Sequence, residues 1–194
     1  MDPNGNKRLF IAIEVPINTI CNALSVLENV DLRGLRLVNK ENLHITIKFL
    51  GHTPNRLLET VISGIEESST GIKPFELQIQ GLGAFPNLAM PRILWMDIKR
   101  DIEPILYIRE RLDSLLNLNG FKTEQREFSP HLTVGRFNKN VSKGDLRMLD
   151  KCIWEISHLP VSCVKINSLN LIESTLTSHG PIYKIRHKET FDTT

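Results

Sequence analysis

The sequence of 194 residues contains no long apolar run, no CxxC pair and no strong excess of charge of either sign. A helix that spans a membrane needs ~20 consecutive apolar residues, and no segment approaches this length. The three cysteines, Cys21, Cys152 and Cys163, are widely spaced. This spacing disfavours a disulfide framework or a thiolate zinc site and fits a reducing compartment. The polar start "MDPNGNKR" does not resemble a signal peptide, so we expect a cytoplasmic protein with no membrane partner.

The formal net charge is +2, with 24 basic and 22 acidic residues. A protein that binds a nucleic-acid duplex along its length usually has a strong basic bias, and this chain has none. RNA therefore remains possible only as a small substrate or as one that is recognised over a short segment. No glycine-rich loop followed by Lys-Ser or Lys-Thr is present, which leaves no support for the use of nucleoside triphosphates. An apolar content of 41% is typical of one globular domain, and we expect a single domain over residues 1–194.

Hydrophobic periodicity predicts an α+β fold with mostly antiparallel sheet, because several strands follow one another without an intervening helix. Helices are predicted over 17–30, 54–68, 102–118 and 145–156. Strands are predicted over 8–15, 35–51 (two segments around a turn at 39–42), 75–85, 92–99, 126–137 (broken at Pro130), 161–174 and 181–191.

Two of these strands carry the same unusual pattern, in "LHITIKF" (43–49) and "PHLTVGRF" (130–137). Side chains alternate in a strand, so His44 and Thr46 share one face, while the apolar residues between them share the other. The same rule puts His131 and Thr133 on one face. A single His-x-Thr segment usually means a structural histidine, but two copies in equivalent settings indicate a shared function.

Two imidazoles and two hydroxyls suit in-line displacement at phosphorus without a metal ion. An imidazole has a pKa near neutrality, so one ring can accept a proton while the other donates one. The hydroxyls can donate hydrogen bonds to the charged phosphate oxygens. The sequence therefore favours His44 and His131 as catalytic residues and Thr46 and Thr133 as phosphate-binding residues, with no cofactor.

The chain resembles the two-histidine phosphoesterase superfamily, and more closely its RNA 2',3'-cyclic phosphodiesterase branch, historically called 2'-5' RNA ligase. The resemblance is carried in order by "RLFIAIEVP", "ENLHITIKFLG", "FELQIQGLGAFPN", "RILWMDIK", "FSPHLTVGRF" and "LIESTLTSHGPIY". It implies two pseudo-symmetric lobes, each a mostly antiparallel sheet with helices on its outer face, and an active-site cleft between the lobes. It also implies metal-independent hydrolysis of a 2',3'-cyclic phosphate end to a 2'-phosphate, with reverse 2'-5' ligation as the related reaction.

The resemblance further implies roles for individual residues. His44 would protonate the leaving 3'-oxygen and His131 would deprotonate the attacking water. Arg136 occupies a position where this branch commonly has an arginine, which suggests a role in substrate binding. Strict alternation would turn Arg136 away from His131, unless the strand ends or bulges at Gly135. The tryptophan that often precedes the first motif is replaced by Leu37.

Several other side chains allow two interpretations. Strict alternation puts Lys48 on the His44 face, at the cleft rim or in solvent. The aromatic residues Phe49, Trp95 and Phe137 could stack on a base, although strand aromatics usually belong to the core. Tyr183 is expected to be structural or at the cleft edge. The remaining histidines share no spacing and are expected at the surface or in turns: His52, His158, His179 and His187.

The expected partner is RNA that ends in a 2',3'-cyclic phosphate, with tRNA fragments among the candidates, and the protein is expected to be a monomer. One alternative is hydrolysis of another small cyclic phosphate, such as an ADP-ribose cyclic phosphate. A metal protein with His44 and His131 as ligands is disfavoured because no Asp, Glu or Cys accompanies either histidine at ligand spacing. A non-catalytic RNA-binding module is disfavoured by the near-neutral charge and the intact pair of motifs.

Overall fold

The computed structural model describes residues 5–124, 127–137, 141–178 and 180–192. Its strands are β1 (Asn6–Glu14), β2 (Leu35–Leu37), β3 (His44–Pro54), β4 (Phe75–Phe85), β5 (Ile93–Arg100), β6 (His131–Phe137), β7 (Ser162–Ile166), β8 (Ser168–Thr177) and β9 (Gly180–Thr190). Its α-helices are α1 (Cys21–Glu28), α2 (Leu58–Ser69), α3 (Glu103–Asn117) and α4 (Lys143–Ser157). Short 3-10 turns precede α1, β3 and α2, namely η1 (Ile17–Thr19), η2 (Lys40–Asn42) and η3 (Asn55–Leu57).

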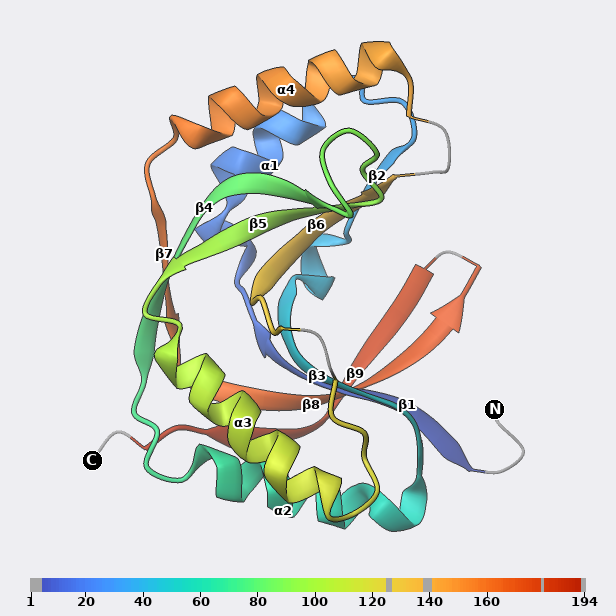
Figure 1. The fold of residues 1–194 in the computed structure, drawn as a ribbon, viewed down its shortest axis with the longest axis vertical. Helices are drawn as coiled ribbons and strands as arrows, with labels where there is room; N and C mark the ends of the chain where they lie inside the picture. Colours follow the sequence, from blue (N-terminus) through green and yellow to red (C-terminus); the bar gives the residue numbers. More distant parts are fainter. Residues whose placement is uncertain (1–4, 125–126, 138–140, 179, 193–194) are drawn as a thin grey trace.

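All of the described strand pairs are antiparallel, in the order β7-β4-β5-β6-β3-β1-β8-β9, and β2 pairs with β6. The sheet curls and divides into two lobes (Figure 1). The β4 lobe contains β2, β4, β5, β6 and β7, with α1 and α4 outside it, whereas the β1 lobe contains β1, β3, β8 and β9, with α2 and α3 outside it. This arrangement confirms the predicted α+β, two-lobed architecture.

The lobes are not the two halves of the chain, however. The predicted strand at 161–174 is in fact two strands on either side of Asn167, and they belong to different lobes. β7 pairs with β4 in one lobe, and β8 pairs with β1 in the other. Similarly, the predicted strand over 126–137 begins only at His131, and residues 125–126 lie outside the described part of the chain.

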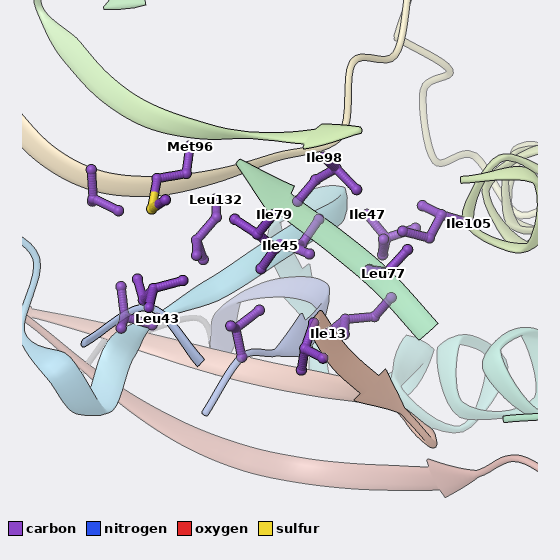
Figure 2. Packing of buried hydrophobic residues seen from close by; sticks show 14 of the residues in the cluster. Ile13, Leu43, Ile45, Ile47, Leu77, Ile79, Met96, Ile98, Ile105 and Leu132 are labelled. Carbon is purple, nitrogen blue, oxygen red and sulfur yellow. The ribbon is translucent and has the colours of Figure 1, made fainter. Parts of the chain in front are cut away.

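One continuous apolar core runs behind the sheet and fixes the motif strands. In β3, Ile45 and Ile47 are fully buried, and in β6, Leu132 and Val134 are fully buried. Figure 2 shows Ile45 and Leu132 in this cluster, together with Ile105 of α3. Because alternate residues of each motif strand are anchored in the core, the intervening histidine and threonine must lie on the opposite face.

Candidate active site

The two motif strands meet at one ladder position. β3 and β6 pair antiparallel through Ile45 and Leu132. Continued by one residue in each direction, this register places His44 across from Thr133, and Thr46 across from His131. The two motifs are thus related by a local twofold axis between Ile45 and Leu132, in agreement with the pseudo-symmetry that the family resemblance implies.

Both histidines are held in the same way. Nδ1 of His44 lies 2.7 Å from the carbonyl oxygen of Asn42, and Nδ1 of His131 lies 2.8 Å from the carbonyl oxygen of Ser129. A carbonyl oxygen can only accept a hydrogen bond, so each Nδ1 must carry the proton and donate it. In the neutral ring, Nε2 then keeps its lone pair. Each motif consequently offers Nε2 as the atom that can exchange a proton.

Each motif strand also has a bulge directly after its threonine. In the β1–β3 ladder, Ala12 faces Thr46 and Ile11 faces Lys48, so Ile47 is the extra residue. In the β5–β6 ladder, Trp95 faces Thr133 and Leu94 faces Gly135, which leaves one extra residue at the same motif position. A bulge shifts the alternation of the side chains that follow it.

The bulge explains the position of Arg136. Val134 and Gly135 are both buried, and Arg136 is exposed, so the phase of β6 changes at this point. Arg136 therefore returns to the face of His131 and Thr133. The positive charge of Arg136 lowers the pKa of His44, so the guanidinium on β6 lies within electrostatic reach of the motif on β3. Of the two alternatives for this strand, the bulge is the one observed.

The same bulge in β3 turns Lys48 away from the site. Lys48 is only 1% exposed, and its ammonium group contacts Asp113 of α3 and the carbonyl oxygen of Lys122, the latter at 3.0 Å. The expected position of Lys48 on the His44 face, at the rim or in solvent, was therefore wrong. Phe49 takes the place that strict alternation gave to Lys48, and it is 60% exposed.

Aromatic rings surround His44. Its ring centroid lies 4.9 Å from that of Phe10 on β1 and 5.3 Å from that of Tyr183 on β9, and the Tyr183 ring stands edge-on. Phe10 and Tyr183 are themselves 5.1 Å apart. Together with Ala12 and Ile172, these rings form a small apolar cluster on the site face of the sheet. Tyr183 thus lies in the site rather than in the main core.

His131 has an equivalent pair of aromatic neighbours in the other lobe. The ring centroid of Phe85 lies 5.0 Å from that of His131, edge-on, and the centroid of Trp95 lies 6.0 Å away. The Trp95 ring covers Gly83, where an added Cβ would come within 2.5 Å of the indole. Nε1 of Trp95 is buried without a hydrogen-bond partner in the described structure. Of the three aromatic residues weighed from the sequence, Phe137 belongs to the core, Trp95 lies beside His131, and Phe49 is exposed beside Phe10.

Burial has the largest effect on the pKa of His44 and lowers it below its usual value of 6.5. The hydrogen bond to Asn42 opposes this shift, whereas the charges of Arg136 and His131 add to it. The charge of His131 thus affects His44 across the junction of the lobes. In the free protein at neutral pH, His44 is therefore mainly neutral.

Among the described residues, one group has three potential metal ligands close together. Ligand atoms of Glu66 on α2 and of His187 and Glu189 on β9 all lie within 4.8 Å of one another. Neither motif histidine belongs to this group. His187 is half-buried in a strand, so the prediction of a surface or turn position was wrong for it, whereas His52 and His158 are exposed as expected. His179 lies outside the described residues.

The sequence prediction missed two members of the site, Phe10 and Phe85. Phe10 belongs to a strand with apolar residues on both faces, but Arg8 and Glu14 share its face and were an available signal that this side is not core. Phe85 is the last residue of β4 and gave no such signal.

The sequence of the chain is similar to a known protein family and to named proteins. The model of the 2'-5' RNA ligase superfamily matches residues 19–177. A protein of Methanocaldococcus jannaschii named RNA 2',3'-cyclic phosphodiesterase is 33% identical over 178 residues, which cover 92% of this chain and 97% of the relative. A protein of the same name from Thermotoga maritima is 29% identical, with 95% of this chain and 96% of the relative covered.

Solved structures have the same fold. A crystal structure of TT0787 from Thermus thermophilus superposes with a TM-score of 0.76 at 22% identity and covers 95% of this chain and 97% of that one. The structure of Escherichia coli LigT complexed with 3'-AMP gives a TM-score of 0.75 at 18% identity, with 97% and 99% covered. These two likenesses concern the fold alone.

Proposed function

Because the chain belongs to the 2'-5' RNA ligase superfamily, we propose that it is an RNA 2',3'-cyclic phosphodiesterase that hydrolyses the cyclic end to a 2'-phosphate. The observation that carries the proposal is the pair of imidazoles on adjoining strands. His44 and His131 each donate from Nδ1 to a backbone carbonyl and keep Nε2 for proton exchange. Two such groups provide a general base and a general acid in one site.

In this reaction, Nε2 of His131 removes a proton from water as the water oxygen bonds to phosphorus. The bond between phosphorus and the 3'-oxygen breaks, and protonated His44 gives its proton to the departing oxygen. The products are a 2'-phosphate and a free 3'-hydroxyl. The same sequence of steps, with the 5'-hydroxyl of a second RNA in place of water, would form a 2'-5' bond and release the same 3'-hydroxyl.

Thr46 and Thr133 would donate hydrogen bonds to the two non-bridging phosphate oxygens. Arg136 would add positive charge on the same face. The negative phosphate would also raise the pKa of His44, which is lowered in the free protein, and so favour the protonated ring that this step needs. The RNA end would lie in the cleft expected between the lobes, against the aromatic residues beside each histidine.

The proposed enzyme acts as a monomer and a single domain in the cytoplasm, without a metal ion or cofactor, and tRNA fragments fit it as substrates. No helix in the described residues combines the length and apolar character needed to cross a membrane. The near-balanced charge agrees with recognition of an RNA end rather than of a long duplex.

The test is incubation with a short RNA that ends in a 2',3'-cyclic phosphate, with the position of the product phosphate assigned by phosphorus NMR. A 2'-phosphate is expected. A 3'-phosphate, or no hydrolysis, would refute the proposal. A second substrate, in which the 3'-oxygen is replaced by sulfur, assigns the acid because a thiolate leaves without protonation. With this sulfur-containing substrate, the His44→Ala variant should recover much of the hydrolysis rate that it loses with the natural cyclic phosphate, while His131→Ala should not.

A further inference from the structure

Arg109 is a buried cation on α3, behind the first motif. It is 6% exposed, and its Nη1 donates a hydrogen bond to the carbonyl oxygen of Ile47. Ile47 is the bulge residue of β3, directly after Thr46. The guanidinium therefore binds the backbone at the point where the first motif departs from regular strand geometry.

The carbonyl group of Ile47 lies where the pairing between strands is interrupted on both sides of β3. On one side, β3 pairs with β1, but Ile47 has no paired residue in this ladder. On the other side, the ladder between β3 and β6 consists of the single pair Ile45–Leu132 within the described residues. A buried carbonyl without a partner would cost free energy, and Arg109 supplies the donor.

Arg109 also contacts the segment that leads into the second motif. Its Cζ atom lies 5.2 Å from the ring centroid of Phe128, and its Nη2 lies 3.6 Å from the carboxylate of Glu124. Phe128 directly precedes Ser129, whose carbonyl oxygen holds Nδ1 of His131. A single side chain thus contacts the supports of both motifs.

Two further residues fix the direction of Arg109. Asp113, one helical turn later on α3, accepts a hydrogen bond from Nε of Arg109 at 2.8 Å. The other oxygen of Asp113 accepts from Lys48, which also donates to the carbonyl oxygen of Lys122. The two cations are balanced by Asp113 and Glu124, so the buried charges are paired and hydrogen-bonded.

We propose that Arg109 is a positioning residue of the proposed reaction, because it fixes the spacing of the two motifs from behind the sheet. The strands that carry His44 and His131 share one ladder pair, and Arg109 adds a connection between β3 and the segment that leads into β6. This inference rests on the proposed function, because it concerns the geometry in which both imidazoles act on one phosphate. A misplacement of about 1 Å in such a site can cost roughly a hundredfold in rate.

The first test is a comparison of Arg109→Met with Arg111→Met. Arg111 lies on the same helix and also donates to a backbone carbonyl, that of Thr70, and lies over a ring, that of Tyr107. It is half-buried, and neither of these partners belongs to a motif strand. Arg109→Met should lower kcat by roughly ten- to a hundredfold, with KM changed by less than about threefold. Arg111→Met should leave both constants near those of the wild type.

Arg109→Lys keeps the positive charge but loses the planar fork that reaches two partners at once. It should give a kcat between those of the wild type and of Arg109→Met. If Arg109→Met does not fold, as judged by circular dichroism, Arg109→Lys carries the test alone. The proposal would be overturned if the fraction of unfolded variant at the assay temperature accounts for the whole decrease in apparent kcat. It would also be overturned if a folded Arg109 variant has the kcat of the wild type.

A second measurement separates this inference from the proposed function. The nitrogen-15 signals of the imidazoles report the Nδ1–H tautomer without any substrate. Arg109→Met should shift the signals of His44 and His131, and Arg111→Met should not. If the wild-type protein fails to hydrolyse the cyclic end, the proposed function fails, and these signals alone decide. Unchanged signals in folded Arg109→Met would then overturn the positioning role.

Discussion

The ring of Tyr183 stands edge-on to the imidazole of His44, with the two centroids 5.3 Å apart. Both side chains lie within the electrostatic field of Arg136. Burial raises the pKa of the Tyr183 hydroxyl, and Arg136 opposes that rise, whereas the same arginine lowers the pKa of His44. One guanidinium on β6 therefore influences two titrating groups of the other lobe.

Removal of this charge should change the titration of His44. In Arg136→Gln, the pKa of His44 should rise toward its usual value of 6.5, because a nearby positive charge disfavours the imidazolium. The measurement is an NMR titration of the His44 ring without substrate. Arg147→Gln, an exposed change on α4, is the control and should leave the curve in place. A fall in the pKa of His44 in Arg136→Gln would contradict the electrostatic assignment.

The same shift has a consequence for stability. Because the pKa of His44 is lower in the folded than in the unfolded chain, the unfolded chain binds more protons at mildly acidic pH. The contribution of His44 to the free energy of unfolding is therefore present above pH 6.5 and is lost as the pH falls through the folded-state pKa of His44. Arg136→Gln should lose less stability over this range, as measured by urea unfolding at a series of pH values.

The threonine hydroxyls should matter mostly in the transition state. Thr46→Val and Thr133→Val keep the shape of the side chain but remove the donor. Each should lower kcat by roughly ten- to a thousandfold, judging from the loss of single oxyanion donors in other enzymes. Thr175→Val, at an exposed position of β8, serves as the control. A change in KM alone would mean that the hydroxyls bind substrate and transition state equally.

Phe49 should stack on a base of the RNA end. The bulge after Thr46 brings it to the site face, where it is 60% exposed and its ring centroid lies 6.2 Å from that of Phe10. Base stacking is worth about 1–3 kcal/mol, so Phe49→Ala should raise KM by roughly ten- to a hundredfold with little loss of stability. Trp154→Ala removes an aromatic ring of similar exposure on α4 and should have no effect. An equal KM in both variants would place the base elsewhere.

Hydrolysis should persist in excess EDTA. Two imidazoles provide both proton transfers, so no metal-bound water is needed to generate the nucleophile. The group formed by Glu66, His187 and Glu189 should have no part in the rate, and His187→Gln should hydrolyse the cyclic end as the wild type does. Loss of the rate with the chelator, followed by recovery with a divalent ion, would favour a metal-dependent mechanism.

Much of the site could be read from the sequence because period-two alternation is a local property of a strand. It placed His44 with Thr46, and His131 with Thr133, on common faces. The alternation failed at Ile47, directly after Thr46, because a bulge depends on the pairing with the partner strand. No residue of β3 marks the bulge in the sequence. Lys48 was consequently assigned to the wrong face. The break at Asn167, which sends β7 and β8 into different lobes, likewise depends on pairing with strands distant in the sequence.

The interleaving of the two lobes bears on how the protein forms during synthesis. β1 leaves the ribosome early, but one of its two neighbours, β8, ends only at Thr177. Until then, one edge of β1 has no strand beside it, and an open edge can pair with other chains. Contacts between such distant segments also slow folding. The β1 lobe, which carries His44, should therefore be completed after most of the β4 lobe, and nascent chains that stop before residue 168 should aggregate.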